Sequence, residues 1–206
     1  MLFLFYLKFY ILYYFKNIRL YKMNIIFPDD LDRFSPYIML IIVSILCYVY
    51  KLPYTYPIKF LLNGAVSNRI LKNYIFKPLL KNNSYPFIGT GIRPKNAMNC
   101  GIFRDNFFDN KREVKISSSY GFPSGHSQSA GYFMAFIHKY FKNSPVIYYS
   151  SLIYSIYIPY TRIVLNCHTI QQIISGYIFG IITFYLFDYI ENKLNKKINI
   201  KNYNKI

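Results

Sequence analysis

Three long stretches of this 206-residue chain carry no charged side chain, and they constrain its fold more than any other feature. They run over residues 34–50, 143–161 and 169–187. A helix needs about 20 mostly apolar residues, or about 17 at the lower limit, to cross the hydrocarbon core of a bilayer. Because a charged side chain in that core is costly, uncharged runs of this length predict membrane helices.

The composition agrees with a membrane protein. Hydrophobic residues make up 53% of the chain and charged residues only 16%, whereas soluble proteins average roughly 45–50% and about 25%. The formal charge of +17 suits nucleic acid, anionic lipid headgroups or a phosphorylated substrate. Because the same chain contains several apolar runs, lipid phosphate is the favoured partner, and we expect no nucleic acid to bind.

Three further segments predict the remaining helices. Residues 1–15 are apolar and are followed, not preceded, by positive charge, so we interpret them as an uncleaved anchor. Residues 58–76, ended by Pro78, and residues 127–141 are not apolar all round, which predicts helices packed inside a bundle. The expected fold is an all-α, polytopic membrane bundle of about five to six membrane helices.

The expected organisation has three parts. They are N-terminal membrane anchor helices in 1–57, a catalytic core in 58–190 with a long polar loop at 77–124, and a basic tail in 191–206. Loops of that length in compact domains are usually functional or disordered. Gly176 and Gly180 form a small-xxx-small pair that predicts close helix packing.

The motif PSGH at residues 123–126 is suited to binding an anion. Pro123 ends any preceding helix, Ser124 can cap the next one, and Gly125 lets backbone approach a ligand. A helix N-terminus carries unpaired N–H groups and the positive end of the helix dipole. His126 directly follows, where it can act on whatever the anion is bonded to.

Other candidate residues converge on the same membrane face. Arg162 ends one uncharged run and His168 precedes the next, so both lie where two helices meet. If the helix after His126 starts on that face, all three residues come together there. Arg93 lies in the long loop that leads to this face, whereas His138 fits a plain surface role.

The order Arg-Pro, Pro-Ser-Gly-His and Arg-x5-His resembles the type 2 phosphatidic acid phosphatase superfamily over about residues 60–190. These lipid phosphatases share their active site with vanadium haloperoxidases and bacterial acid phosphatases. The resemblance implies an all-helical, commonly six-span membrane protein that needs no metal or other cofactor. It further implies hydrolysis of a lipid phosphate or an isoprenyl diphosphate through a phosphohistidine.

The resemblance also implies roles for individual residues. His168 would be the nucleophile and His126 the general acid. The phosphate would be bound by Lys72, Arg93, Ser124, Gly125 and Arg162.

The first motif departs from the family pattern, because no lysine stands seven residues before Arg93. Lys72 is the best match if residues 79–92 are an insertion. Lys77 and Lys81 remain alternatives.

The third motif departs twice. Thr161 replaces a serine, which keeps the hydroxyl, and Gln172 stands where the family has aspartate. An amide oxygen can accept a hydrogen bond from the Nδ1–H of His168 but cannot offer charge to an imidazolium, so we expect Gln172→Asp to raise activity. Three loop carboxylates are alternative sources of that charge: Asp105, Asp109 and Glu113.

Two further functions stay open beside the hydrolase: transfer of the phosphoryl group to an alcohol, and non-catalytic binding of phosphate lipids. Halide oxidation with vanadate is a third, disfavoured because those relatives are mainly soluble. Short basic loops weigh heavily in topology, so Lys139, Lys142 and the lysine-rich tail predict a lumenal or extracellular catalytic face. Cys100 and Cys167 fall near that face, which leaves a disulfide between them open.

Overall fold

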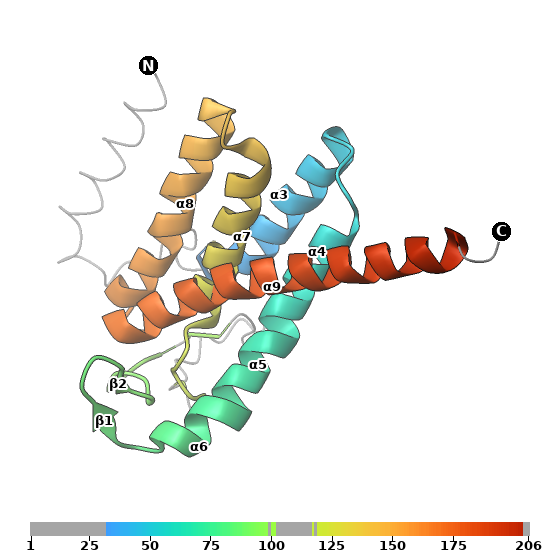
Figure 1. The fold of residues 1–206 in the computed structure, drawn as a ribbon. Helices are drawn as coiled ribbons and strands as arrows, with labels where there is room; N and C mark the ends of the chain where they lie inside the picture. Colours follow the sequence, from blue (N-terminus) through green and yellow to red (C-terminus); the bar gives the residue numbers. More distant parts are fainter. Residues whose placement is uncertain (1–31, 99, 102–116, 118, 204–206) are drawn as a thin grey trace, which may run out of the picture. The chain divides into compact units, whose positions relative to one another are not determined.

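The computed structural model describes residues 32–98, 100–101, 117 and 119–203, with side chains through residue 196. The anchor predicted at residues 1–15 lies outside the described residues. The described chain is mostly helical (Figure 1). Its longest single helices are α3 (Ser35–Val49), α7 (Gly125–Phe141), α8 (Pro145–Val164) and α9 (Ile170–Tyr203).

A composite helix runs from Thr55 to Leu80 and alternates between α and π turns. Its segments are α4 (Thr55–Leu62), η1 (Asn63–Ser67), α5 (Asn68–Ile70), η2 (Leu71–Phe76) and α6 (Lys77–Leu80). The residues at the joints keep right-handed helical dihedrals, so the backbone is continuous. The prediction that Pro78 ends this helix is wrong. The wider π turn just before it accommodates a residue that has no N–H to donate.

The segment predicted as the loop 77–124 has structure of its own. It begins with α6 and continues into an antiparallel hairpin of β1 (Ser84–Tyr85) and β2 (Gly89–Thr90). After the hairpin the backbone returns to α7, and the N–H groups of Gly121 and Phe122 donate to the Gly91 carbonyl at 2.9 and 3.1 Å. The hairpin is therefore held next to the start of α7.

Helix α7 lies at the centre of the described fold and packs against α3, α8 and α9 (Figure 1). Its buried positions are mainly aromatic and aliphatic, which places the main apolar core around it. That core includes Met39, Val43, Tyr132, Phe133, Phe136, Ile137, Ile158 and Phe184.

Glycines bring α7 and α9 into close contact. A Cβ on Gly131 would lie 2.0 Å from the Tyr177 carbonyl oxygen, and one on Gly180 would lie 2.0 Å from the Gln128 carbonyl oxygen. Gly176 is similar, at 2.4 Å from the Ser124 carbonyl oxygen. The predicted packing role of Gly176 and Gly180 is confirmed.

One helix in the described part of the chain, within Ile170–Lys196, is long and apolar enough to cross a membrane. Its outer face carries Ile174, Ile178 and Ile182 at four-residue spacing, each about half exposed. Helix α8 is long enough but rich in serine and tyrosine, which lowers its hydropathy. The prediction of five to six spans is therefore not confirmed and stays a prediction.

Helix α9 extends to Tyr203, well into the segment predicted as a separate basic tail. No proline or glycine follows Gly180 to interrupt it. At the far end of α7 from His126, Lys139 bonds Asp188 of α9 at 2.6 Å. Close by, Lys59 bonds Glu191 at 2.5 Å. These ion pairs fasten the end of the bundle opposite the PSGH motif.

Candidate functional site

The PSGH motif forms the N-terminus of α7, as predicted. Ser124 is the N-cap, and its Oγ accepts hydrogen bonds from the backbone N–H and the hydroxyl of Ser127 at 3.4 and 3.1 Å. The Ser124 N–H donates to the Gln172 carbonyl at 3.0 Å. Ser124 is fully buried, so its side chain supports the helix start from below, while Gly125 and His126 line the open side of the site.

The turn between α8 and α9 joins Arg162 to His168. The carbonyl of Arg162, in the last turn of α8, accepts from the N–H groups of Cys167 and His168 at 2.9 and 3.2 Å. Asn166 supports this tight reversal with a positive φ of 52°. The spacing of five residues between Arg162 and His168 is the length of this closed turn.

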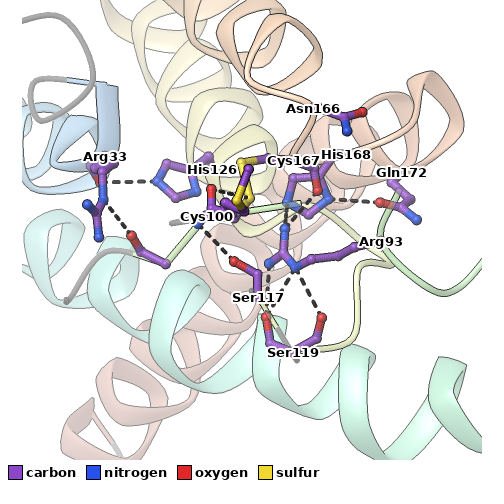
Figure 2. The surroundings of a disulfide bond; sticks show 12 residues. Arg33, Arg93, Cys100, Ser117, Ser119, His126, Asn166, Cys167, His168 and Gln172 are labelled. Atoms are coloured by element: carbon purple, nitrogen blue, oxygen red, sulfur yellow. Dashed lines mark hydrogen bonds between the residues drawn. A yellow bond between two sulfur atoms is a disulfide. The ribbon is translucent and has the colours of Figure 1, made fainter. Parts of the chain in front are cut away.

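Gln172 fixes the ring of His168 (Figure 2). The Oε1 of Gln172 lies 2.9 Å from His168 Nδ1, and its Nε2 donates to the carbonyls of Thr90 and Ile92 at 2.9 and 2.6 Å. Because only an amide N–H can donate to a carbonyl, the orientation of the amide is determined, and Oε1 must accept from Nδ1–H. His168 is therefore held as the tautomer whose lone pair is on Nε2.

Arg93 reaches the other nitrogen of the same ring. Its Nη1 lies 2.9 Å from His168 Nε2 and donates to the Cys167 carbonyl at 2.8 Å. Its Nε and Nη2 donate to the carbonyl and the hydroxyl of Ser119, both at 3.0 Å. A guanidinium only donates, so Nε2 accepts, which agrees with the tautomer set by Gln172.

A cavity of about 410 Å³ joins these residues. One end is polar and is lined by Lys72, Arg93, Gly125, His126 and His168. The other end is apolar and is lined by Pro36, Tyr37, Leu40, Phe60 and Leu61. The described residues that line this cavity include two cations and no carboxylate, a charge pattern that favours an anion.

Of the three candidate lysines, Lys72 lines the cavity. Its two rivals, Lys77 and Lys81, are exposed and do not line the cavity. The π turns place Lys72 one helical turn beyond Asn68, on the same side as the site. The reading of residues 79–92 as an insertion agrees with this placement, because β1 and β2 lie within that range.

Arg162 is not among the described residues that line the cavity. It is fully buried, and its charge acts on both His126 and Arg93. Its role in binding phosphate, expected from the sequence, stays a prediction.

The two histidines are nearly buried, with 5% of His126 and 3% of His168 exposed. His126 Nε2 donates to the Arg33 carbonyl at 3.1 Å, which leaves Nδ1 to take up a second proton. Burial, and then the charge of Arg162, lowers the pKa of His126 well below its ordinary value. Burial, and then Arg93, does the same to the pKa of His168. Both rings are consequently neutral in the empty site at neutral pH.

Sequence reasoning missed three contributors: Arg33, Asn68 and Ser119. Asn68 lines the cavity and donates from Nδ2 to Gln128 Oε1 at 2.7 Å. Its position four residues before Lys72 on a helix is a signal that could have found it. Arg33 acts through its backbone carbonyl, and Ser119 lies in an unremarkable serine run, so no pattern marks either one. The loop carboxylates Asp105, Asp109 and Glu113 lie outside the described residues.

Comparisons with known proteins agree with this geometry. The family model of the PAP2 superfamily matches residues 60–196, which contain every residue lining the polar end of the cavity. No curated protein and no solved structure matches the chain. The family match covers about two thirds of the sequence and includes all three motifs. The chain belongs to the PAP2 superfamily.

Proposed function

We propose that the protein is a membrane phosphatase that hydrolyses a lipid phosphate or an isoprenyl diphosphate through a phosphohistidine intermediate. Membership of the PAP2 superfamily supports phosphatase-type or related phosphoesterase chemistry. The observation that carries the proposal is the pair of hydrogen bonds around His168. Gln172 holds the proton on Nδ1, so the lone pair of Nε2 faces the donors of Arg93.

The polar end of the cavity suits a phosphoryl group in transfer. Fixed donors that neutralise the three equatorial oxygens supply most of the catalysis in phosphoryl transfer. Arg93 and Lys72 line this end, and the first turn of α7 faces it at Gly125. A bound phosphate draws the Arg93 guanidinium onto its oxygens, which releases Nε2 for attack.

The first half of the reaction breaks the ester bond. Nε2 of His168 donates its lone pair to phosphorus, and the bond from phosphorus to the lipid oxygen breaks as the N–P bond forms. His126, charged by proton uptake at Nδ1 when the anionic substrate binds, gives one proton to the departing oxygen.

The second half releases phosphate. Water attacks the phosphohistidine, its proton passes to His126, and the N–P bond breaks to restore neutral His168. Lys72, Arg93 and the buried charge of Arg162 stabilise both transition states, and these cations take the role that a metal ion has in other phosphatases.

The apolar end of the cavity supports a lipid substrate. Leu40, Phe60 and Leu61 line the same cavity as the two histidines, so a phosphate ester with a hydrocarbon chain fills both ends. The half-exposed isoleucines of α9 support contact with a bilayer. The multi-pass topology, the anchor in 1–57, the core in 58–190 and the tail in 191–206 belong to this proposal.

The disulfide between Cys100 and Cys167 supports a catalytic face in a lumen or outside the cell, because disulfides persist in oxidising compartments. The two cysteines border the cavity, and Cys100 lines it. This placement agrees with the topology expected from Lys139 and Lys142.

The test is release of phosphate by purified protein in detergent, with a chelator present. Substrates are phosphatidic acid, lysophosphatidic acid and an isoprenyl diphosphate, and the matched control is His168→Ala. We expect metal-independent turnover that His168→Ala abolishes, and acid-labile radiolabel on the wild-type protein. Label that moves to an added alcohol instead of water would identify a transferase. Wild type no faster than His168→Ala, with phosphatidic acid still bound, would leave only a binding role.

A further inference from the structure

A disulfide joins two segments that both reach the site. Cys100 and Cys167 are 67 residues apart in sequence, with Cα atoms 5.5 Å apart. Cys100 belongs to the long loop that carries Arg93, and Cys167 to the turn between α8 and α9 that carries His168. Both side chains are nearly buried, with 2% and 1% exposed.

On one side of the disulfide, the backbone of Cys167 forms hydrogen bonds with Arg93 and Arg162. Its carbonyl accepts from Arg93 Nη1 at 2.8 Å, and its N–H donates to the Arg162 carbonyl at 2.9 Å. His168 is the next residue, so a shift of Cys167 moves the ring of His168 and the anchor of Arg93 together.

On the other side, a chain of hydrogen bonds leads to His126. The carbonyl of Gly101, next to Cys100, accepts from Arg33 Nε at 3.0 Å, and the Arg33 carbonyl accepts from His126 Nε2 at 3.1 Å. The N–H of Cys100 also donates to Ser117 Oγ at 3.0 Å. Figure 2 shows these contacts leading from one histidine to the other across the two sulfur atoms.

Besides the disulfide and the contacts of Arg93, a hydrogen bond joins the same two segments, because Asn166 Nδ2 in the turn donates to the Lys95 carbonyl in the loop at 2.9 Å. The apolar cluster around the disulfide consists of Ala97, Cys100 and Cys167, with Leu165 packed against it. A cluster of this size contributes little burial, so the covalent link is the strongest tie between the two segments next to Cys100 and Cys167.

We infer that the Cys100–Cys167 disulfide is a positioning element that sets Arg93 against His168 and ties both to His126. The inference rests on the proposed function, since it assigns those three residues to one reaction. Reduction breaks the Sγ–Sγ bond and adds two electrons and two protons, which dithiothreitol supplies as it closes to its own cyclic disulfide. The two segments then separate, and the guanidinium leaves its place beside Nε2.

The test compares Cys47→Ala with Cys47→Ala/Cys100→Ala/Cys167→Ala. Cys47 is the free cysteine of the described chain and lies in the core beside α7, away from the cavity. The first variant keeps the disulfide without any free thiol, so it is the matched control. The probe is orthovanadate, a phosphate analogue, whose affinity is measured by calorimetry alongside lipid phosphate turnover.

Loss of the disulfide is expected to weaken orthovanadate binding about tenfold and to lower kcat/KM about tenfold or more. In an Arg93→Ala background the same loss should weaken orthovanadate binding much less, because one of the groups that the disulfide positions is gone. A purely structural role would weaken binding equally in both backgrounds and would overturn the inference. So would equal affinity and turnover with and without the disulfide.

Two further arms keep the result decisive. If the triple variant does not fold, Cys47→Ala replaces it after reduction with dithiothreitol, alkylation of the two thiols with iodoacetamide and removal of both reagents, because dithiothreitol reduces vanadate. Circular dichroism checks that this protein stays folded, and the same loss of affinity of about tenfold is expected. If no variant, wild type included, turns over a lipid phosphate, the hydrolase proposal fails. The orthovanadate comparison then still supports or overturns the positioning role.

Discussion

At the scale of single residues, Gln172 is the least expected member of the site, because every polar atom of its side chain has a hydrogen-bond partner there. Its Nε2 is committed to the carbonyls of Thr90 and Ile92, and its Oε1 to Nδ1–H of His168. An aspartate at this position would be one methylene shorter, and its carboxylate would face two carbonyl oxygens with no proton to share. The amide is therefore the better partner at this position, because the two neighbouring carbonyls need an N–H donor that a carboxylate does not have.

The structure therefore reverses the effect expected from sequence for Gln172→Asp. We predict that this substitution lowers kcat about tenfold or more, because His168 loses the bond that fixes its tautomer. Steady-state phosphate release measures the effect, and Gln171→Asp, at the exposed neighbouring residue, is the matched control. Turnover by Gln172→Asp at or above the wild-type rate would contradict the assignment.

The lowered pKa of His126 predicts that the protein takes up a proton when it binds an anion. Its pKa is lowered in the empty site, so the ring is neutral at neutral pH, and a bound dianion favours the charged form. Affinity for sulfate, a dianion that does not titrate in this range, should fall as pH rises from about 5 to about 8. Calorimetry in two buffers of different ionisation heat measures the uptake. His126→Gln should remove the proton uptake, and the surface variant His138→Gln, as the control, should keep it. Proton uptake that survives in His126→Gln would show that another group binds the proton.

Sequence predicted the site residues that act through side chains in motifs. Arg93, His126 and His168 meet in one cavity as the order of motifs suggests, with Lys72 beside them. The sequence could not distinguish residues that line the cavity from buried residues next to it, since Ser124 fits both a helix cap and a phosphate ligand. Contacts made by backbone, such as the Arg33 carbonyl on His126, leave no trace in a motif.

At the scale of secondary-structure elements, the contact of α7 with α9 places His126 beside His168. Both helices start at the site, and glycines let their backbones meet without side chains between them. Sequence predicted the starts of these helices because caps, prolines and charges mark them. No such sequence signal predicted the π turns of the composite helix, because these turns depend on how the helix packs around the cavity.

Gly131→Ala should destabilise the fold through this helix contact. The added Cβ would lie 2.0 Å from a backbone carbonyl of Tyr177, and α9 would have to move away. We expect a loss of about 2 kcal/mol or more in unfolding free energy, measured by thermal or denaturant unfolding in detergent. Gly64→Ala is the control, because its Cβ would lie at an ordinary 3.8 Å from Ser129 Oγ. Equal stability of the two variants would contradict the close approach.

At the scale of the whole molecule, α7 and α8 run antiparallel between two ends of different chemistry. The site lies at one end, and the ion pairs of Lys139 and Lys59 lie at the other. A helix the length of α8 spans about 30 Å, the thickness of a bilayer core. The multi-pass topology that we propose would place these two ends at opposite faces of the membrane.

Cysteine labelling in sealed vesicles tests this topology. Lys95→Cys lies beside the site and Lys142→Cys in the turn between α7 and α8, and both positions are exposed. In a Cys47→Ala background, a membrane-impermeant maleimide should label Lys95→Cys from the lumenal or extracellular side and Lys142→Cys from the opposite side. Labelling of both positions from one side would contradict a membrane-spanning α7 and α8.

Two of the three departures of this chain from the family pattern meet in one contact. The hairpin lies in the segment read as an insertion, and the carbonyls at its end, Thr90 and Ile92, accept the amide protons of Gln172. The carbonyls of this segment and the amide of Gln172 thus form a matched pair, because each satisfies the hydrogen bonds of the other. An engineer who shortens the hairpin to the family length should restore aspartate at position 172 in the same step, because either change alone leaves His168 without its orienting partner.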